Sequence, residues 1–434
     1  GTSEIPLIKG DVSDQAVLSN TTATVLPNNV PLRAYNAAGT ASIDLLKLDA
    51  DNVVRLGGSA DKGLRQTASF HLSATAKMLD QVFFIAPYAM KVEKVQFFYD
   101  VVNTGAFTGQ IKKMADGVAL ASGTAIHTAL DLTATARTVY SATLSATAGV
   151  LDLAYKDRLG IDYVGSLNGF AGVTVTITFT HGGKGDFAVF YKLPAAEITD
   201  QNFHLALYPQ TIQSILYSHM TLGSDSGAVT CLVKKCTTTQ AAAAGTTVQG
   251  AGTSFNCKST INTVQVGTLA ATRDLYRVAP GDRLALDVTG TTTALTGVVV
   301  VVTFDPDQSP TDRVTVRYIE ELNADMADAT FFIADQNYEI LEAAEVHATA
   351  FAGAVNVHLT RDAVLTAAGA GTKLNTVTID GFQGDGTAET VQFVAFAGWV
   401  AGQRFLLKGD RLGVDYTAAT TGIGCLIAVA LKPV

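Results

Sequence analysis

The hexapeptide Asp157-Arg158-Leu159-Gly160-Ile161-Asp162 occurs in three related copies along this chain. The other two copies are Asp282-Arg283-Leu284-Ala285-Leu286-Asp287 and Asp410-Arg411-Leu412-Gly413-Val414-Asp415. They begin 125 residues apart (157 to 282) and 128 residues apart (282 to 410). This spacing is too long for a solenoid unit and suits a small domain, so we expect one domain in three copies.

Two further matches lie in the same register. Phe83-Phe84-Ile85-Ala86 recurs as Phe331-Phe332-Ile333-Ala334, with Phe203-His204-Leu205-Ala206 as the relative in the middle copy. From these blocks to the Asp-Arg-Leu phrase the intervals are 74, 79 and 79 residues. A looser match between the two anchors reads Ile111-Lys112-Lys113, Val233-Lys234-Lys235 and Leu359-Thr360-Arg361. The registers predict a separate region at 1–66 and three repeats at 67–184, 185–309 and 310–434.

The apolar residues follow strand patterns. Val173–Phe179 alternates apolar residues with threonine, which predicts a strand with its valines in the core and its threonines outside. Val298–Phe304 is apolar on both faces, so a neighbouring element is expected to cover one side, and Cys425–Leu431 is similar. Hydrophobic content is 48% and charged content only 16%. We therefore predict an all-β chain, an N-terminal extended arm followed by three tandem jelly-roll-like β-sandwiches.

The repeated phrase is interpreted as a turn followed by a strand. Asp157 belongs to the turn, and Leu159 and Ile161 share the face that enters the core. Arg158 and Asp162 are then expected on the other face, in surface ion pairs with neighbours. Because Asp157 and Asp162 face opposite ways, they do not form the paired carboxylates of a glycosidase.

The first 66 residues are predicted to form two or three short strands, with turns at Ala38-Gly39 and Asp51-Asn52. This region has too little apolar mass to fold alone. It must dock on its own body, on sister chains or on another protein. An extended anchoring arm is the natural interpretation.

Charge and hydropathy disfavour several classes of partner. The formal net charge is −9 and no basic run is present, so we expect no nucleic-acid binding. No stretch of 18 apolar residues occurs, so we expect no membrane-spanning helix.

The motifs that would carry chemistry are absent or incomplete. Gly182–Gly185 lacks the spacing of a phosphate loop, and Asp49–Asn52 lacks the rest of a calcium loop. Asp305-Pro306-Asp307 is better explained as a stiff linker than as a cation site. His347 and His358 could be neighbours across a hairpin, but they make a poor zinc site. We expect no catalytic, cofactor-binding or metal-binding residues, and buried reduced thiols at Cys231, Cys236, Cys257 and Cys425.

Several segments resemble tailed-bacteriophage virion proteins. They are Ala228–Thr230, Phe255–Thr260, Gly281–Gly290 and Thr291–Phe304 in the second repeat, and Tyr35–Thr40 and Leu48–Gly57 in the arm. In such phages, similar proteins decorate or cement the capsid or form head fibres. The resemblance therefore implies a non-enzymatic virion protein, made in the host cytoplasm and placed on the capsid surface.

Three hypotheses follow. In the first, the arm anchors a decoration or cement protein by adding strands to the major capsid protein or to sister subunits. Either a homotrimer or one chain with three repeats then occupies a threefold position. In the second, the chain is a head or tail fibre whose sandwiches bind a host glycan, although Trp399 is its only tryptophan. The third, a depolymerase, needs a carboxylate pair that the sequence does not provide.

Overall fold

The computed structural model describes much of the chain. The described residues are 32–35, 42–48, 54–56, 64–72, 79–181, 186–193, 198–223, 227–237, 239–305, 314–320, 328–350, 356–363, 365–368, 370–374, 382–383, 388–393, 404–417 and 423–434. The chain divides into two compact units, Gly1–Lys62 and Gly63–Val434.

The first unit contains one small antiparallel sheet. Its strands are β1 (Leu32–Tyr35), β2 (Ser42–Leu48) and β3 (Val54–Leu56), in the order β1-β2-β3. The prediction of two or three short strands is confirmed, and the predicted turn residues lie outside the described part. Within this sheet, β1 and β3 are the edge strands.

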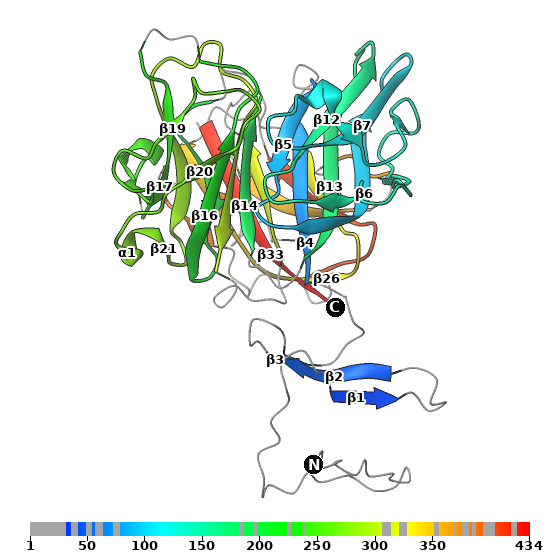
Figure 1. The fold of residues 1–434 in the computed structure, drawn as a ribbon. Coiled ribbons are helices and arrows are strands. Elements are labelled where there is room, and N and C mark those ends of the chain that lie inside the picture. The colour runs from blue at the N-terminus through cyan, green and yellow to red at the C-terminus, as the bar shows by residue number, and fades with distance from the viewer. Residues whose placement is uncertain are drawn as a thin grey trace, which may run out of the picture. The chain divides into compact units, whose positions relative to one another are not determined.

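In the described residues of the second unit, each repeat contributes ten strands. Figure 1 shows how they are arranged. Repeat 1 has β4 (Leu64–Leu72), β5 (Gln81–Ile85), β6 (Met90–Val101), β7 (Phe107–Met114), β8 (Thr124–Ala125), β9 (Leu130–Asp131), β10 (Tyr140–Ser141), β11 (Asp152–Leu153), β12 (Arg158–Gly165) and β13 (Ala171–His181). Repeat 2 has β14 (Phe187–Lys192), β15 (Gln201–Leu205), β16 (Gln210–Ser218), β17 (Thr230–Cys236), β18 (Thr246–Thr247), β19 (Phe255–Asn256), β20 (Gln265–Gly267), β21 (Arg277–Val278), β22 (Arg283–Thr289) and β23 (Val298–Phe304). Repeat 3 has β24 (Val314–Glu320), β25 (Ala329–Ile333), β26 (Tyr338–Thr349), β27 (Asn356–Asp362), β28 (Thr372–Lys373), β29 (Phe382–Gln383), β30 (Gln392–Phe393), β31 (Phe405–Leu406), β32 (Arg411–Tyr416) and β33 (Ile423–Pro433). Helical structure in the described residues is limited to α1 (Arg273–Tyr276) and the 3-10 turns η2 (Leu120–Ser122) and η4 (Ala242–Ala244).

Each repeat folds into two antiparallel sheets with the same strand order. In repeat 1 the orders are β10-β6-β13-β4, with β11 also on β6, and β5-β12-β7-β8, with β9 also on β7. The corresponding strands of repeats 2 and 3 follow both orders. The chain passes back and forth between the two sheets, and the first strand of a repeat pairs with its last, as β4 does with β13. The all-β, jelly-roll-like tandem architecture is confirmed.

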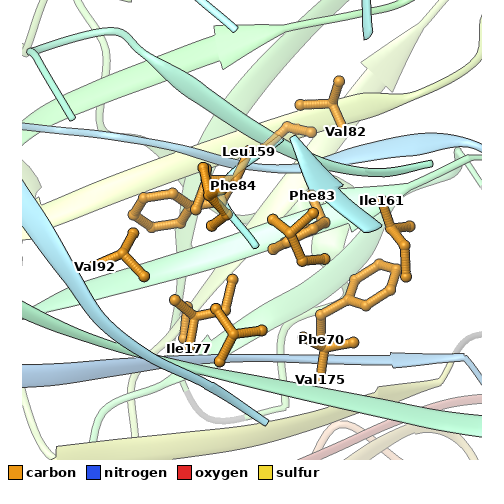
Figure 2. Close-up of a cluster of buried hydrophobic side chains, with 14 of the residues drawn as sticks. Phe70, Val82, Phe83, Phe84, Val92, Leu159, Ile161, Val175 and Ile177 are labelled. Atoms are coloured by element: carbon orange, nitrogen blue, oxygen red, sulfur yellow. The ribbon is translucent and has the colours of Figure 1, made fainter. Parts of the chain in front are cut away.

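The core of each repeat lies between its two sheets. In repeat 1, Phe70, Phe84, Leu159 and Ile177 come from four different strands and are fully or almost fully buried. Figure 2 shows these side chains converging with their neighbours on one cluster. At about 25 cal/mol per Å² of apolar surface removed from water, such clusters supply the main driving force for folding.

The valine-rich strand β23 is covered on both faces, as its sequence predicts. Val298, Val300 and Val302 face the core of repeat 2. Val299 and Val301 instead join the buried cluster that contains Phe83 of repeat 1. The covering element is β5, which packs on β23 and β14.

Three of the four threonines of β13 are buried, so their expected exposure to solvent is wrong. Thr174, Thr176 and Thr178 are each at most 2% exposed because β25 of repeat 3 lies against them. The backbone N–H of Ile333 donates to Thr176 Oγ1 at 3.1 Å, and Thr178 Oγ1 donates to Asp335 Oδ2 at 3.0 Å. Threonine fits such a face because its hydroxyl can pair with a neighbouring backbone.

The contacts between repeats run in a closed circle. β5 of repeat 1 packs on β23 of repeat 2, β15 of repeat 2 on β33 of repeat 3, and β25 of repeat 3 on β13 of repeat 1. In each case, the second strand of one repeat packs on the last strand of the next repeat. Head-to-tail contacts of this kind close when the rotation between units is right, and here they close after three repeats of one chain. Figure 1 shows the three repeats gathered side by side.

Candidate functional site

The three copies of the Asp-Arg-Leu phrase lie next to the junctions between repeats. The first aspartate of each copy closes a turn of four residues. Asp157 Oδ2 accepts the N–H of Ala154, and Asp282 and Asp410 make the same bond, each at 2.9 Å. The predicted turn and strand are confirmed, and the apolar residues of the phrase are fully buried.

The arginine of each phrase is also fully buried, so its expected surface position is wrong. Arg283 Nη2 donates to the carbonyls of Gln240 at 2.8 Å and Thr237 at 3.5 Å. The corresponding carbonyls are those of Ala115 and Val118 for Arg158, and those of Ala363 and Thr366 for Arg411. A guanidinium survives burial here because its forked donors match a turn rich in free carbonyl oxygens. Burial lowers the pKa of Arg158 to about 10.

The last aspartate of each phrase keeps the predicted ion pair. Asp162 meets Lys112 at 2.9 Å, Asp287 meets Lys234 at 2.9 Å, and Asp415 meets Lys373 at 2.8 Å. The second lysine of the looser sequence match has its own role. Lys113 Nζ donates to two carbonyls of a loop, those of Gly149 and Asp152, and Lys235 does the same to those of Asp274 and Arg277.

A further repeated aspartate was missed by the sequence analysis. Asp80, Asp200 and Asp328 each accept a backbone N–H at 2.6–2.9 Å, from Tyr163, Val288 and Tyr416. Burial raises the pKa of Asp80, and the nearby charge of Asp162 raises it further. The signal that could have found it is an aspartate just before β5, β15 and β25. In each repeat, the aspartate that corresponds to Asp80 accepts a backbone N–H, and the one that corresponds to Asp162 pairs with a lysine.

Each junction is built on two residues with left-handed backbone. Arg137, Asn262 and Glu389 have φ of 61°, 60° and 59°, and Gly117, Thr239 and Leu365 have φ of 81°, 60° and 66°. The N–H of Gly117 donates to Asn262 O, that of Thr239 to Glu389 O, and that of Leu365 to Arg137 O, at 2.9–3.1 Å. Non-glycine residues rarely adopt this conformation, and its recurrence marks equivalent positions in the three repeats.

The three junctions differ in how they meet the buried arginine. Between repeats 1 and 2, Arg158 Nη1 donates to Asn262 Oδ1 at 3.1 Å. Between repeats 2 and 3, Arg283 forms an ion pair with Glu389, whose carboxylate also accepts from Asn202 at 3.1 Å. An amide thus serves one junction and a carboxylate the other.

The junction between repeats 3 and 1 surrounds its buried arginine with a third set of residues. An arginine, Arg137, stands where the others have Asn262 and Glu389. Burial lowers the pKa of Arg411, and the charge of Arg137 lowers it further. Arg411 lies over the ring of Phe98, with its guanidinium carbon 3.9 Å from the ring centroid. Arg137 pairs instead with Asp100 at 2.8 Å. The aromatic face adds a cation–π contact to the attraction that the carboxylates of Asp362 and Asp100 exert on Arg411.

A second polar contact supports the junction between repeats 2 and 3. Arg317 Nε donates to His204 Nδ1 at 3.0 Å, and His204 Nε2 meets Gln210 Oε1 at 2.7 Å. Burial, followed by the charge of Arg317, lowers the pKa of His204 well below its ordinary value. His204 is therefore a neutral spacer between two repeats.

A small cavity lies where the first strands of all three repeats meet. Its volume is about 40 Å³, and its lining includes His71 from β4, Tyr191 from β14 and Arg317 from β24. Such a volume holds a few water molecules and excludes a sugar ring or a nucleotide. Polar and apolar side chains of all three repeats line it.

The sequence candidates for chemistry are not brought together. His347 and His358 lie in β26 and β27, which belong to different sheets, so the idea of a shared hairpin is wrong. His347 Nδ1 contacts Glu345 at 3.0 Å inside the sandwich. Among the described residues, no group of three or more histidine, cysteine or acidic side chains could hold a metal ion. The four cysteines are buried and free, as predicted.

Several candidates lie outside the described residues. They are Gly182–Gly185, Asp49–Asn52, Pro306, Asp307 and Trp399. No helix in the described part of the chain is both long and apolar enough to cross a membrane.

No family model matches the chain, and no curated protein matches it either.

Proposed function

We propose that this chain is a structural, non-catalytic protein of a tailed-phage virion, which decorates or cements the capsid surface. The observation that carries the proposal is the closed circle of three repeats within one chain. A body of this kind presents related surfaces in three directions, which suits a threefold position on a capsid. A single chain then fills each threefold position, which would otherwise need a trimer.

The buried charges favour a scaffolding role. The buried arginines of the three Asp-Arg-Leu copies donate to backbone carbonyls. They also contact residues of the next repeat, which are Asn262, Glu389 and Phe98. Asp162, Asp287 and Asp415 are paired with lysines. The repeated charged residues thus serve the fold and its junctions.

Residues 1–66 are proposed as the anchor. The small sheet β1-β2-β3 has edge strands at β1 and β3. An edge strand can pair with a strand of another chain through its backbone groups. Strand addition to the major capsid protein or to a sister subunit would hold the body in place, with many weak contacts acting together.

Decoration is favoured over glycan binding by the distribution of exposed aromatics. A sugar-binding role predicts an aromatic groove at the same place in each repeat. The exposed large aromatic side chains in the described residues are Tyr155, Phe393 and Phe405. They occupy different positions in their repeats, so they form no repeated surface.

The test is binding to capsids assembled without this protein. The full chain and a variant lacking residues 1–60 are mixed with such capsids and sedimented. We expect the full chain to sediment with the capsids and the shortened chain to stay in solution. If the shortened chain occupies all the capsid sites, the proposed anchoring role of residues 1–66 is wrong. If the full chain does not bind capsids, the proposed decoration role is wrong. Heat release of capsids with and without the protein then separates cement from decoration.

A further inference from the structure

Two of the four cysteines form a pair in the core of repeat 2. Cys231 lies in β17 and Cys257 directly follows β19, and their sulfur atoms are 3.2 Å apart. Both residues are fully buried. The backbone holds them in place, because Cys231 pairs with Phe255 across the two strands and the N–H of Cys257 donates to Val229 O at 2.9 Å.

The other two thiols have different surroundings. Cys236 lies near the carbonyls of Ala241 and Ala242, at 3.7 Å from each. Cys425 lies 3.9 Å from Glu345. These two cysteines are buried to a similar degree, so they serve as matched controls for the pair.

The fold does not require cysteine at the paired positions. In repeat 1, Gly109 and Leu132 occupy the equivalent places, and a Cβ on Gly109 would lie 3.0 Å from Leu132 Cδ1. The same two positions are therefore in contact in both repeats. Repeat 2 fills the contact with two thiols instead of a glycine and a leucine.

We propose that Cys231 and Cys257 are a latent cross-link, which a peroxide converts into a disulfide that ties β17 to the loop after β19. The sulfurs must approach from 3.2 Å to about 2.0 Å, a movement that side-chain rotation can provide. The strand β19 has two residues, and the flanking Asn256 and Lys258 are exposed. Local opening of this short strand admits a molecule as small as hydrogen peroxide.

The chemistry proceeds in two balanced steps. The Cys257 thiolate attacks one peroxide oxygen, the O–O bond breaks, and a sulfenic acid and hydroxide form. The Cys231 sulfur then attacks the sulfenic sulfur, the S–O bond breaks, and the hydroxyl leaves as water with the Cys231 proton. Hydroxide takes up the proton that Cys257 lost, so two thiols and one peroxide give one disulfide and two waters.

Cys257 is the better nucleophile of the two. Its sulfur accepts a hydrogen bond from Tyr217 OH at 3.1 Å. The thiol of Cys231 and the hydroxyl of Tyr217 both lower the pKa of Cys257, whereas the hydrogen bond to Cys257 and burial raise that of Cys231. The order of attack therefore places the sulfenic acid on Cys257.

The experiment counts thiols in the native full-length protein before and after hydrogen peroxide, with denaturation before the thiol reagent is added. The reduced chain has four thiols. We expect two after oxidation, four again after dithiothreitol, and a cross-link between the tryptic peptides 193–234 and 236–258. Because the second peptide contains Cys236 as well as Cys257, the Cys236→Ser variant identifies the partner.

The variants make the outcomes distinct. Cys236→Ser should fall from three thiols to one, and Cys425→Ser should do the same. Cys231→Ser should keep three, or lose one to a sulfenic or higher acid without forming an internal disulfide. Four surviving thiols in the native wild-type chain, or a cross-link that disappears in Cys236→Ser, overturns the proposal. The wild-type and Cys236→Ser results decide the matter even if Cys231→Ser folds poorly.

Discussion

The backbone N–H of Leu365 donates to the carbonyl of Arg137 at 2.9 Å, and this bond joins the third repeat to the first. The same bond links Gly117 to Asn262 and Thr239 to Glu389 at the other two junctions. Six residues with left-handed backbone thus form three equivalent links. Their recurrence means that the third repeat meets the first as each of the others meets its successor.

The junction between repeats 2 and 3 should depend most strongly on one side chain. Glu389→Ala removes the carboxylate that faces the buried Arg283, and it leaves that cation with carbonyl acceptors but without its counter-ion. We expect the free energy of unfolding to fall by about 3 kcal/mol. Urea denaturation followed by intrinsic fluorescence measures it.

The control for that variant is Asn262→Ala at the junction between repeats 1 and 2. It removes a hydrogen bond from Arg158 to an uncharged acceptor, so the loss should be smaller, about 1–2 kcal/mol. Equal losses for the two variants would contradict the distinct chemistry of the two junctions.

The junction between repeats 3 and 1 should depend on the threonines of β13. Thr176→Val keeps the shape of the side chain but removes the oxygen that accepts the N–H of Ile333. A buried donor without an acceptor costs about 1–3 kcal/mol, and thermal unfolding should report that loss. Thr180→Val, on the same strand but outside this contact, should change stability by less than about 0.5 kcal/mol. A Thr176→Val variant as stable as wild type would remove the evidence for a hydrogen-bonded seam.

Stability should fall with acid because of His204. Burial and Arg317 hold the folded pKa of His204 well below the unfolded value of about 6.5, so the unfolded chain binds the extra proton. The contribution is fully present above pH 6.5 and is lost as pH falls below it, by up to about 1.4 kcal/mol per pH unit. Urea titrations between pH 7.5 and 5 should show this slope.

His204→Gln isolates that contribution. Glutamine can still accept from Arg317, but it binds no proton in this range. The free energy of unfolding should then change less steeply with pH, by the amount that the uptake of about one proton contributes. The slope that remains reflects other buried histidines such as His127 and His219, whose pKa values burial also lowers. Identical slopes in the two proteins would rule out His204 as a source of the acid sensitivity.

The sequence predicts the strands and the repeats well because both depend on local patterns. The alternation in Val173–Phe179 identifies the core face of β13, and the double-sided run in β23 indicates a covering neighbour. The position of Arg158 was beyond such reasoning. Its burial depends on the carbonyls of Ala115 and Val118, in the turn after β7, and on the side-chain amide of Asn262, 104 residues away.

The threonines of β13 show the same limit from the other side. An alternating strand looks the same whether its polar face meets water or the backbone of a neighbour. Only the packing of β25 against β13 distinguishes the two cases. The equivalence of Arg137, Asn262 and Glu389 was equally hidden, because the three side chains share a backbone conformation and no chemistry.

The most direct test of the closed circle is an engineered cross-link between the first and third repeats. Thr178 Oγ1 and Asp335 Oδ2 are 3.0 Å apart, so cysteines at both positions should form a disulfide on mild oxidation. Electrophoresis without reductant should then show one species at the 45.3 kDa mass of a single chain, and a tryptic map should contain a disulfide between the peptides that carry positions 178 and 335. Ladders of linked chains, or no cross-link at all, would contradict closure of the three repeats within one chain.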